Sequence, residues 1–569
     1  MVSIGWLVGS MITGIIGFFF SFLIPINMFL SVIVSIIQLL FVYLFNGVRI
    51  FSIRFHKLNL SKISMEKSPS IYILLFFFSI ISNIVLKSIY SGFPNSIPTD
   101  FVHTMDSESS LVSSILFGVN YNRNSFFLKD PLNQNNVSPI SNVPMFFQAL
   151  LMACGITYSE SSVLICYMNI ISTVCSLFYY SYYLSCSSLI TTSMFLLNGS
   201  FVFLRLLKND CGKGNDCIHN VNQNVSLPWY QIFISFICMN KSVSFSIPMS
   251  IFSVIISSFS YNVSKAMSYT MSGILLALIP TLSVSLATFL YISCISTAFY
   301  YLFPYGLSIL PKLFYSQIHY NPLWKEQQMH GKMYSQINMW FKGFGIVFIS
   351  LVSYIFVETS MISLHRFYIA LSILIVFSVI RFGNDYYMNA SAICAVSYPQ
   401  FVSCLTNIII HYVSIAKTQF KKGLIIGLSI CIVVFEIIGG IASIIIILNN
   451  RSLLFNEFDF QCSEWIKHST NIQDQFLSPP ASFLPSCLFA GRQIIVGNPK
   501  STWVYGSEVF HNLEFVQSLI NNVRPFHELK NLSIKYIIDY KNSHFMIHNM
   551  NIPHQLVFQN EKWVIYHIK

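Results

Sequence analysis

The sequence predicts a polytopic α-helical membrane protein that ends in a small α/β domain. Of its 569 residues, 54% are hydrophobic and only 9% are charged, and the mean hydropathy is +0.62. Runs of about 20 apolar residues recur, and each is long enough to cross a hydrocarbon core of roughly 30 Å as a helix. After residue 448 the apolar runs stop and polar residues mix with apolar ones. These observations predict a transmembrane core over residues 1–448 and a separate domain over residues 449–569.

The transmembrane core is expected to contain about 11 spans, counted from apolar runs of sufficient length. Another apolar stretch, residues 145–154, is too short to cross. The expected spans are residues 3–23, 28–45, 71–90, 161–183, 189–207, 242–261, 271–293, 341–357, 367–382, 392–412 and 423–448.

Clusters of basic residues predict the orientation of the spans. Residues 49–67 carry five Lys or Arg against one Glu, so the positive-inside rule places this linker in the cytoplasm. The next span then crosses outward, and the long loop 91–142 lies on the lumenal side. Lysines at 417–422 mark the cytoplasmic side again. The net charge of +11 is explained by this excess of cytoplasmic Lys and Arg, so we expect no nucleic-acid partner.

The segment 449–569 alternates helix-like and strand-like stretches, which is typical of an α/β unit. The topology places this unit on the lumenal face, beside loop 91–142. The helix-like stretches are residues 464–470 and 515–522, and the strand-like ones are residues 493–496, 535–539 and 563–568.

The start of loop 91–142 gathers acidic residues in a chain that has few. Asp100, His103, Asp106 and Glu108 fall within nine positions, just after the span 71–90. One interpretation is a catalytic site at the membrane surface, and the other is a solvated loop that caps a helix near Ser107. Pro98 precedes Asp100, which favours an extended and then turned backbone that presents this side chain. Asp106 and Glu108 are expected to begin the helix that follows.

Sugar transfer from a lipid phosphate is one chemistry that such a loop supports. It needs a carboxylate for the acceptor, cationic groups for the leaving phosphate, and access from the membrane. The candidates for the phosphate are His103, Lys312 and Arg492. Each has a structural alternative: a loop histidine in water, a cytoplasmic anchoring loop and a salt bridge, respectively. Arg381 and Asp385, near the end of a span, are either a second site or a structural pair. Nucleotide-binding loops and the HExxH and GxSxG motifs are absent from the sequence.

The architecture and several short motifs resemble the GT-C superfamily of integral membrane glycosyltransferases. A closer likeness is to a group of uncharacterised GT-C-like membrane proteins of bacteria and some eukaryotes. The chain lacks the Trp-Trp-Asp-Tyr-Gly motif of the oligosaccharyltransferase catalytic subunit, and the usual late Asp-Asn is reversed as Asn384-Asp385. The motifs that carry the likeness are residues 113–120, Val143-Pro144, Glu464-Trp465-Ile466, Ala490-Gly491-Arg492, Gly497 and residues 503–506.

The resemblance implies an enzyme of the endoplasmic reticulum membrane. It would transfer a hexose from a polyprenyl (dolichyl) phosphate sugar to a lumenal protein or glycolipid acceptor. In GT-C enzymes an acidic residue of the first lumenal loop is the base or a metal ligand. That role falls here to Asp100, Asp106 or Glu108, with a divalent metal ion compatible with the site. The alternative is a non-catalytic membrane scaffold or transporter that retains the fold.

Overall fold

The protein was analysed as a computed structural model. It describes residues 2–47, 69–121, 123, 128–133, 137–138, 143–184, 186–199, 232–238, 240–258, 265–295, 299–310, 318–319, 340, 344–382, 386–453, 455–498, 508–520, 534–542 and 554–568.

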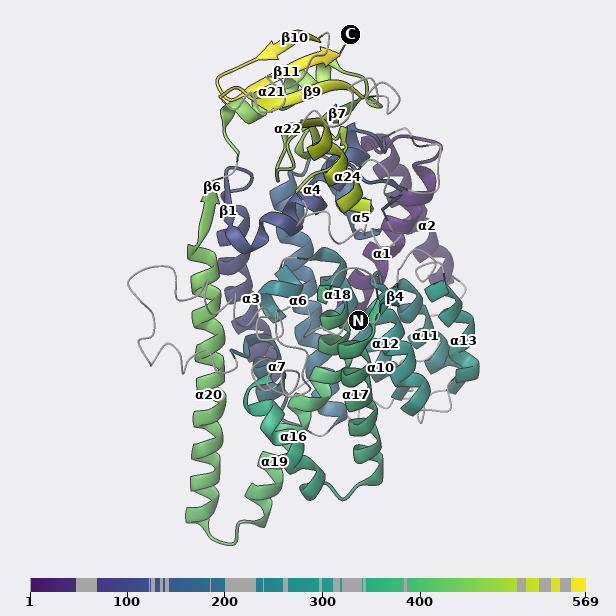
Figure 1. The fold of residues 1–569 in the computed structure, drawn as a ribbon. Helices are drawn as coiled ribbons and strands as arrows, with labels where there is room; N and C mark the ends of the chain where they lie inside the picture. The colour runs from purple at the N-terminus through teal and green to yellow at the C-terminus, as the bar shows by residue number, and fades with distance from the viewer. Residues whose placement is uncertain are drawn as a thin grey trace, which may run out of the picture.

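The body of the molecule is a bundle of apolar helices, as expected for a polytopic helical membrane protein (Figure 1). A helix pairs its own backbone N–H and C=O groups, which is necessary inside a bilayer because no water is available there. Within the described ranges, seven stretches are long and apolar enough to cross a membrane. They are α1 (Val2–Phe20), α3 (Pro69–Tyr90), α6 (Tyr158–Tyr183), α10 (Lys241–Ser258), α17 (Met361–Val379), the run Asn389–Ile415 and α20 (Gln419–Asn449).

The run Asn389–Ile415 begins inside the first of three consecutive elements and includes the other two. They are α18 (Tyr386–Ala392), the π-helical turn η9 (Ile393–Ser397) and α19 (Tyr398–Ile415). The bundle contains further helical elements. They are α2 (Met28–Gly47), α5 (Val143–Ala153), α7 (Ser188–Leu197), the π-helix η6 (Ile232–Cys238), α11 (Lys265–Leu278), α12 (Leu282–Ile295), α13 (Phe299–Gly306), the 3-10 turn η8 (Leu307–Ile309) and α16 (Ile346–Val357).

Three expected spans are wrong as single long helices. Within 189–207 helix α7 ends at Leu197, and within 341–357 helix α16 starts only at Ile346. Residues 271–293 do not form a single helix, because the chain leaves α11 after Leu278 and starts α12 at Leu282. Pro280 lies between the two helices, where its missing N–H and its ring do not allow an α-helix to continue. The two halves pack against α10 as separate short helices.

Helix α10 lies at the centre of the bundle and packs against α6, α11 and α12. Nearly all of its side chains are buried, although seven of its 18 residues are serine and one is proline. Small side chains let the neighbouring helices approach closely, and the hydroxyl groups bond across the contacts. Ser250 and Thr288 share a hydrogen bond of 2.7 Å, and Ser253 and Ser272 share one of 2.9 Å.

The first long loop is folded against the bundle at the end of α3. It contains β1 (Ser96–Pro98), the 3-10 turn η3 (Thr99–Phe101), α4 (Val102–Phe117), β2 (Leu128–Lys129) and β3 (Val137–Ser138). Strand β1 pairs antiparallel with β6 (Arg451–Leu453), directly after α20. Arg451 reinforces this junction by donating to the carbonyl oxygens of Ser88 and Ser96. The beginning of the loop is therefore fixed where α3 and α20 end.

Residues 455–568 include a five-stranded mixed sheet with order β10-β11-β9-β7-β8, which lies at one end of the bundle (Figure 1). Strands β9, β10 and β11 pair antiparallel, while β7 is parallel to β8 and β9. The strands are β7 (Gln475–Leu477), β8 (Gln493–Ile494), β9 (Ile534–Tyr540), β10 (His554–Gln559) and β11 (Trp563–Ile568), and the helices are α21 (Glu457–Ser469), α22 (Pro485–Leu488) and α24 (Glu508–Ile520).

The edge of this sheet at β8 packs directly on the first loop. Ile494 and Gly497 donate backbone hydrogen bonds to the carbonyl oxygens of Pro131 and Leu132. Gly491 adopts a φ of 65°, and its carbonyl accepts from the N–H of Val119 at 3.1 Å. Glycine suits this position, since a side chain there would be strained and would meet the α4 backbone.

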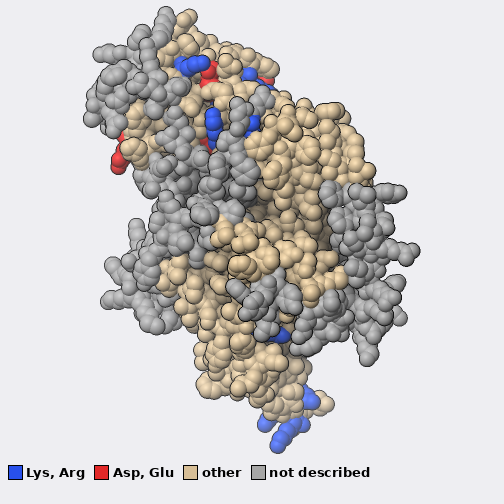
Figure 2. Space-filling view, turned by 90° about the vertical axis from the view of Figure 1, so that its right-hand side faces the viewer, with Lys and Arg blue, Asp and Glu red and all other residues tan. Residues whose placement is uncertain are grey.

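Among the described residues of the visible face, charged side chains gather at its two ends (Figure 2). We call the end that carries the α/β unit the domain end, and the turn between α19 and α20 the basic end. Lys417 and Lys421 lie at the basic end, close to the start of α20. The first loop and the basic turn therefore lie at opposite ends of the bundle, with the apolar spans between them (Figure 1).

Candidate functional site

Helix α4 carries the acidic residues and lies between the membrane bundle and the α/β unit (Figure 1). It begins at Val102, earlier than the start near Ser107 that the sequence suggested, and no side chain caps it. Asp106 and Glu108 are therefore inside the helix, and both are buried, which rules out the solvated-loop interpretation for these two. They are two residues apart, which is a rotation of about 200° around the helix axis, so their side chains point to nearly opposite sides of α4.

Asp106 faces the α/β unit. Its side chain is fully buried, and Oδ1 accepts a hydrogen bond of 2.8 Å from the N–H of Phe483. Phe483 has a φ of 56°, which is unusual for a residue with a side chain. The carboxylate of Asp106 thus fixes a turn just before α22, and this contact joins α4 to the domain. As a catalytic base Asp106 is poorly placed, because it does not reach a surface.

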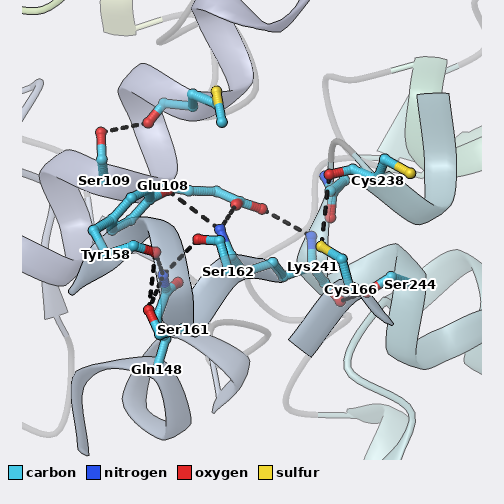
Figure 3. A network of polar contacts seen from close by, with 12 residues as sticks. Glu108, Ser109, Gln148, Tyr158, Ser161, Ser162, Cys166, Cys238, Lys241 and Ser244 are labelled. Carbon is cyan, nitrogen blue, oxygen red and sulfur yellow. Dashed lines mark hydrogen bonds and ion pairs between the residues drawn. The ribbon is translucent and has the colours of Figure 1, made fainter. Parts of the chain in front are cut away.

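Glu108 faces the bundle and forms a buried ion pair with Lys241 at the start of α10 (Figure 3). Oε2 lies 2.5 Å from the Lys241 Nζ, and Oε1 accepts from the backbone N–H of Lys241 at 2.9 Å. The side chain of Lys241 is 0% exposed and that of Glu108 10%. Lys241 Nζ also donates to the hydroxyl of Tyr158 at 3.2 Å. Glu108 therefore neutralises Lys241 and binds the first turn of α10.

A polar network continues from this ion pair into the bundle (Figure 3). The Tyr90 hydroxyl donates to the carbonyl oxygen of Cys238 at 3.2 Å, close to the thiol of Cys166. On the other side of Tyr158, the amide of Gln148 donates to the hydroxyls of Ser161 and Ser162. The network joins α3, α4, α5, α6 and α10, so the acidic helix is anchored to the central spans. Lys241 is not among the residues predicted from the sequence, where its one signal is a single lysine at the start of an apolar run.

Asp130 is a second buried carboxyl group between the first loop and the domain. It is 3% exposed, and its Oδ1 accepts from the N–H of Leu132 at 2.9 Å. Gln493 of β8 donates to its backbone carbonyl. Burial, with a further contribution from the nearby Asp106, raises the pKa of Asp130 to about 7. Asp130 is not among the site residues predicted from the sequence.

Replacing Asp130 with asparagine should remove a pH-dependent weakness of this contact. Because the folded-state pKa is raised, the contribution of Asp130 to stability is present below its ordinary pKa and is lost as the pH rises towards about 7. Asp130→Asn keeps an acceptor for Leu132 and removes the buried charge. Its unfolding midpoint should exceed that of the wild type at about pH 8, and the difference should shrink towards about pH 5.

Thermal unfolding of both proteins over this pH range measures the effect, which should be on the order of a few kcal/mol at the alkaline end. Glu464→Gln is the control, because it removes an exposed carboxylate of the α/β unit on which Asp130 packs. A difference between wild type and Asp130→Asn that does not change with pH would refute a raised pKa at Asp130.

Asp100 and His103 lie at the entrance to α4. The backbone of Asp100 is part of η3, while its side chain is outside the described atoms. The preceding residue, Thr99, donates from its backbone and its hydroxyl to the carbonyl of Asn450, at the end of α20. His103 is half-buried in the first turn of α4. Both residues therefore lie at the domain end of the bundle, where the first loop meets the C-terminal ends of α3 and α20.

The prediction that Arg492 binds a phosphate requires correction, because its side chain has no hydrogen-bond donor left for one. Its Nε donates to the hydroxyl of Thr470, and Nη2 donates to the carbonyl oxygens of Lys467 and Thr470. Its Nη1 donates to the carbonyl oxygens of Phe117 and Ala490, at 2.9 and 2.7 Å. The side chain is buried and uses all five N–H groups within the protein. Arg492 therefore joins the end of α4 to α21 and has a structural role.

The other candidates are described only in part. Lys312 and Asp385 lie outside the described residues, as does the motif at residues 503–506. The backbone of Arg381 belongs to β5 (Arg381–Phe382), which pairs antiparallel with β4 (Ile318–His319). This pairing brings the backbone of Ile318 and His319 next to the end of α17. Among the described residues, no group of three or more His, Cys, Asp or Glu is arranged to hold a metal ion.

Comparisons with known proteins give only distant likenesses. No protein-family model and no curated protein matches the chain. The chain is similar to the oligosaccharyltransferase AglB of Archaeoglobus fulgidus with an inhibitory peptide and dolichol-phosphate, at a TM-score of 0.44 and 10% identity. The apo form of the A. fulgidus enzyme gives a TM-score of 0.45 at the same identity. Each alignment covers 83% of this chain and 70% of the other. Likenesses of this degree assign neither a family nor an activity to this chain.

Proposed function

We propose that this protein is a GT-C-type membrane glycosyltransferase. It would take a hexose from a polyprenyl (dolichyl) phosphate donor and pass it to a lumenal protein or glycolipid acceptor. The observation that carries the proposal is the position of the acidic segment 100–108. It begins at the outer ends of α3 and α20 and is held between the apolar bundle and the α/β unit. A carboxylate at this boundary can meet a lipid-borne sugar and a water-borne acceptor together.

In this proposal Asp100 is the base. Its carboxylate takes the proton of the acceptor hydroxyl as that oxygen forms a bond to the anomeric carbon of the sugar. The bond between this carbon and the donor phosphate breaks, and the polyprenyl phosphate leaves with the electron pair. Cationic or hydrogen-bonding groups must stabilise that phosphate. We assign this role to His103, in the first turn of α4, and to Lys312.

Asp106 and Glu108 then have a supporting role, because their carboxylates fix α4 to the domain and to α10. Such anchoring holds a catalytic group within a narrow range of positions. Arg381 and Asp385 remain a proposed second site at the end of α17. A divalent metal ion bound by the acidic segment would supply further charge for the phosphate. The proposed location is the endoplasmic reticulum membrane.

Purified protein in detergent tests the proposal directly. Incubated with a polyprenyl-phosphate hexose and acceptor, it should release polyprenyl phosphate and transfer the sugar. The reaction is run with a divalent metal ion and with a chelator, which shows whether a metal takes part. Heat-denatured protein is the control. A folded preparation that leaves the donor intact under both conditions would contradict the proposal.

A second candidate function is a non-catalytic membrane scaffold or transporter. One observation favours it: Asp106 and Glu108 are buried and already bonded within the protein, as is Arg492. Buried, internally bonded polar side chains are also what we expect of a network whose only role is to hold helices together. On this account the segment 100–108 serves only to join the domain to the bundle, and Asp100→Asn would leave every lipid-linked and protein-linked glycan unchanged.

A further inference from the structure

Arg123, in the first loop after α4, is buried among aromatic rings at the domain end of α1. Its guanidinium carbon lies 4.0 Å from the ring centroids of Phe18 and Phe22, and 5.2 Å from that of Phe146. Nε donates to the hydroxyl of Ser21 at 3.0 Å, and Nη2 donates to the carbonyl oxygen of Phe18. The aromatic faces stabilise the cation, but they do not neutralise it.

The described residues around Arg123 do not balance its charge. Only 6% of the residue is exposed, and its Nη1 is buried without a hydrogen-bond partner. In the described part of the chain no carboxylate forms an ion pair with it. Burial lowers the pKa of Arg123 to about 10. A buried cation with a spare donor is costly unless an anion joins it.

The surroundings place this cation beside lipid. Phe19, Leu23, Met28 and Phe29, at and just after the end of α1, expose between 54% and 80% of their surface. In a membrane protein, such apolar side chains face the bilayer. The guanidinium lies against the neighbouring rings of Phe18 and Phe22, at the end of the span. The phosphates of lipid headgroups lie at this depth of a bilayer.

We propose that Arg123 anchors a phosphate-binding site at the domain end of α1, and that its ligand is the phosphate of a membrane lipid. The planar guanidinium donates well to phosphate oxygens, and Nη1 supplies the free N–H groups. Nη1 is covered, so binding requires a small shift of the side chains around it. The site does not depend on sugar transfer, since any lipid with an accessible phosphate provides the same chemistry.

A purely structural role for Arg123 is the competing explanation. Its bond to the Phe18 carbonyl caps the C-terminal end of α1, where a cation is favourable. That role accounts for Nη2 and, through Ser21, for Nε. It does not use Nη1, so it predicts no effect of an added phosphate.

The test uses the full-length protein in detergent and follows its thermal unfolding as ligand is added. Short-chain phosphatidic acid is compared with diacylglycerol of the same chain length and with inorganic phosphate. Phosphatidic acid should raise the unfolding midpoint, and diacylglycerol should not. Arg123→Gln should weaken the binding of phosphatidic acid by about tenfold or more, because charge-assisted hydrogen bonds are lost. Lys129→Gln, which removes an exposed cation of the same loop, should bind like the wild type.

Arg123→Lys keeps the charge but loses the fork of donors, so it should bind several-fold more weakly than the wild type and serves if the glutamine variant does not fold. Two results would overturn the site: wild-type affinity in the Arg123 variants, or an equal rise of the midpoint with diacylglycerol. If inorganic phosphate bound as tightly as phosphatidic acid, the lipid assignment would be wrong.

Discussion

Lys241→Met should be among the most destabilising substitutions in the bundle, with a loss of about 3 to 5 kcal/mol. Methionine fills a similar volume, so little packing is lost. Glu108, however, would stay buried with only the backbone N–H of residue 241 and no positive charge beside it. Removing one partner of a buried pair leaves the desolvation cost of the other uncompensated.

Thermal unfolding in detergent, followed by tryptophan fluorescence, measures the effect. Lys421→Met is the matched control, because Lys421 also precedes a long apolar run but is exposed. It should change stability by no more than about 0.5 kcal/mol. The double variant Glu108→Gln/Lys241→Met should recover much of the loss, since no buried charge remains. If Lys241→Met unfolds at the same temperature as Lys421→Met, the ion pair does not hold α4 to α10.

Elements with a strong local pattern could be predicted from the sequence. The span expected at 71–90 is α3 (Pro69–Tyr90), and the strands expected at 535–539 and 563–568 are β9 and β11. The apolar stretch 145–154, expected to be too short to cross, lies mostly in the 11-residue helix α5 (Val143–Ala153). In each case the residues that predict the element and the residues that end it are close together in the sequence. The expected span 271–293 failed because overall hydropathy hid the effect of one proline, Pro280.

The surroundings of the acidic residues could not be predicted, because they depend on distant parts of the chain. Glu108 and Lys241 are 133 positions apart, and Asp106 and Phe483 are separated by 377. Neither separation leaves a local pattern. The expectation that Arg492 binds phosphate failed for the same reason: its acceptors are carbonyl oxygens, which every residue carries and no motif reveals.

Asp100 is the residue on which the proposed chemistry depends, so Asp100→Asn should have the largest effect on activity. The amide keeps the size and much of the hydrogen bonding of the carboxylate, but it is neither a base nor an anion. Loss of a general base typically costs about 100-fold to 10,000-fold in rate. Folding should be preserved, because the backbone contacts of this turn come from its neighbour Thr99.

Asp130→Asn is the matched control for the same chemical change, since Asp130 lies in the same loop but is buried against the domain. It should retain turnover. Asp106→Asn is the informative comparison, because it weakens the contact of α4 with Phe483 without touching Asp100.

The rate at which purified protein releases polyprenyl phosphate from a polyprenyl-phosphate hexose, measured for the wild type and for Asp100→Asn, is the most direct test of the central claim. We expect turnover by the wild type, turnover by Asp130→Asn, and a loss of at least about 100-fold in Asp100→Asn with an unchanged unfolding midpoint. Wild-type turnover by Asp100→Asn, together with an inactive but folded Asp106→Asn, would move the base to Asp106. Equal rates in all of these variants would contradict a catalytic role for the acidic segment.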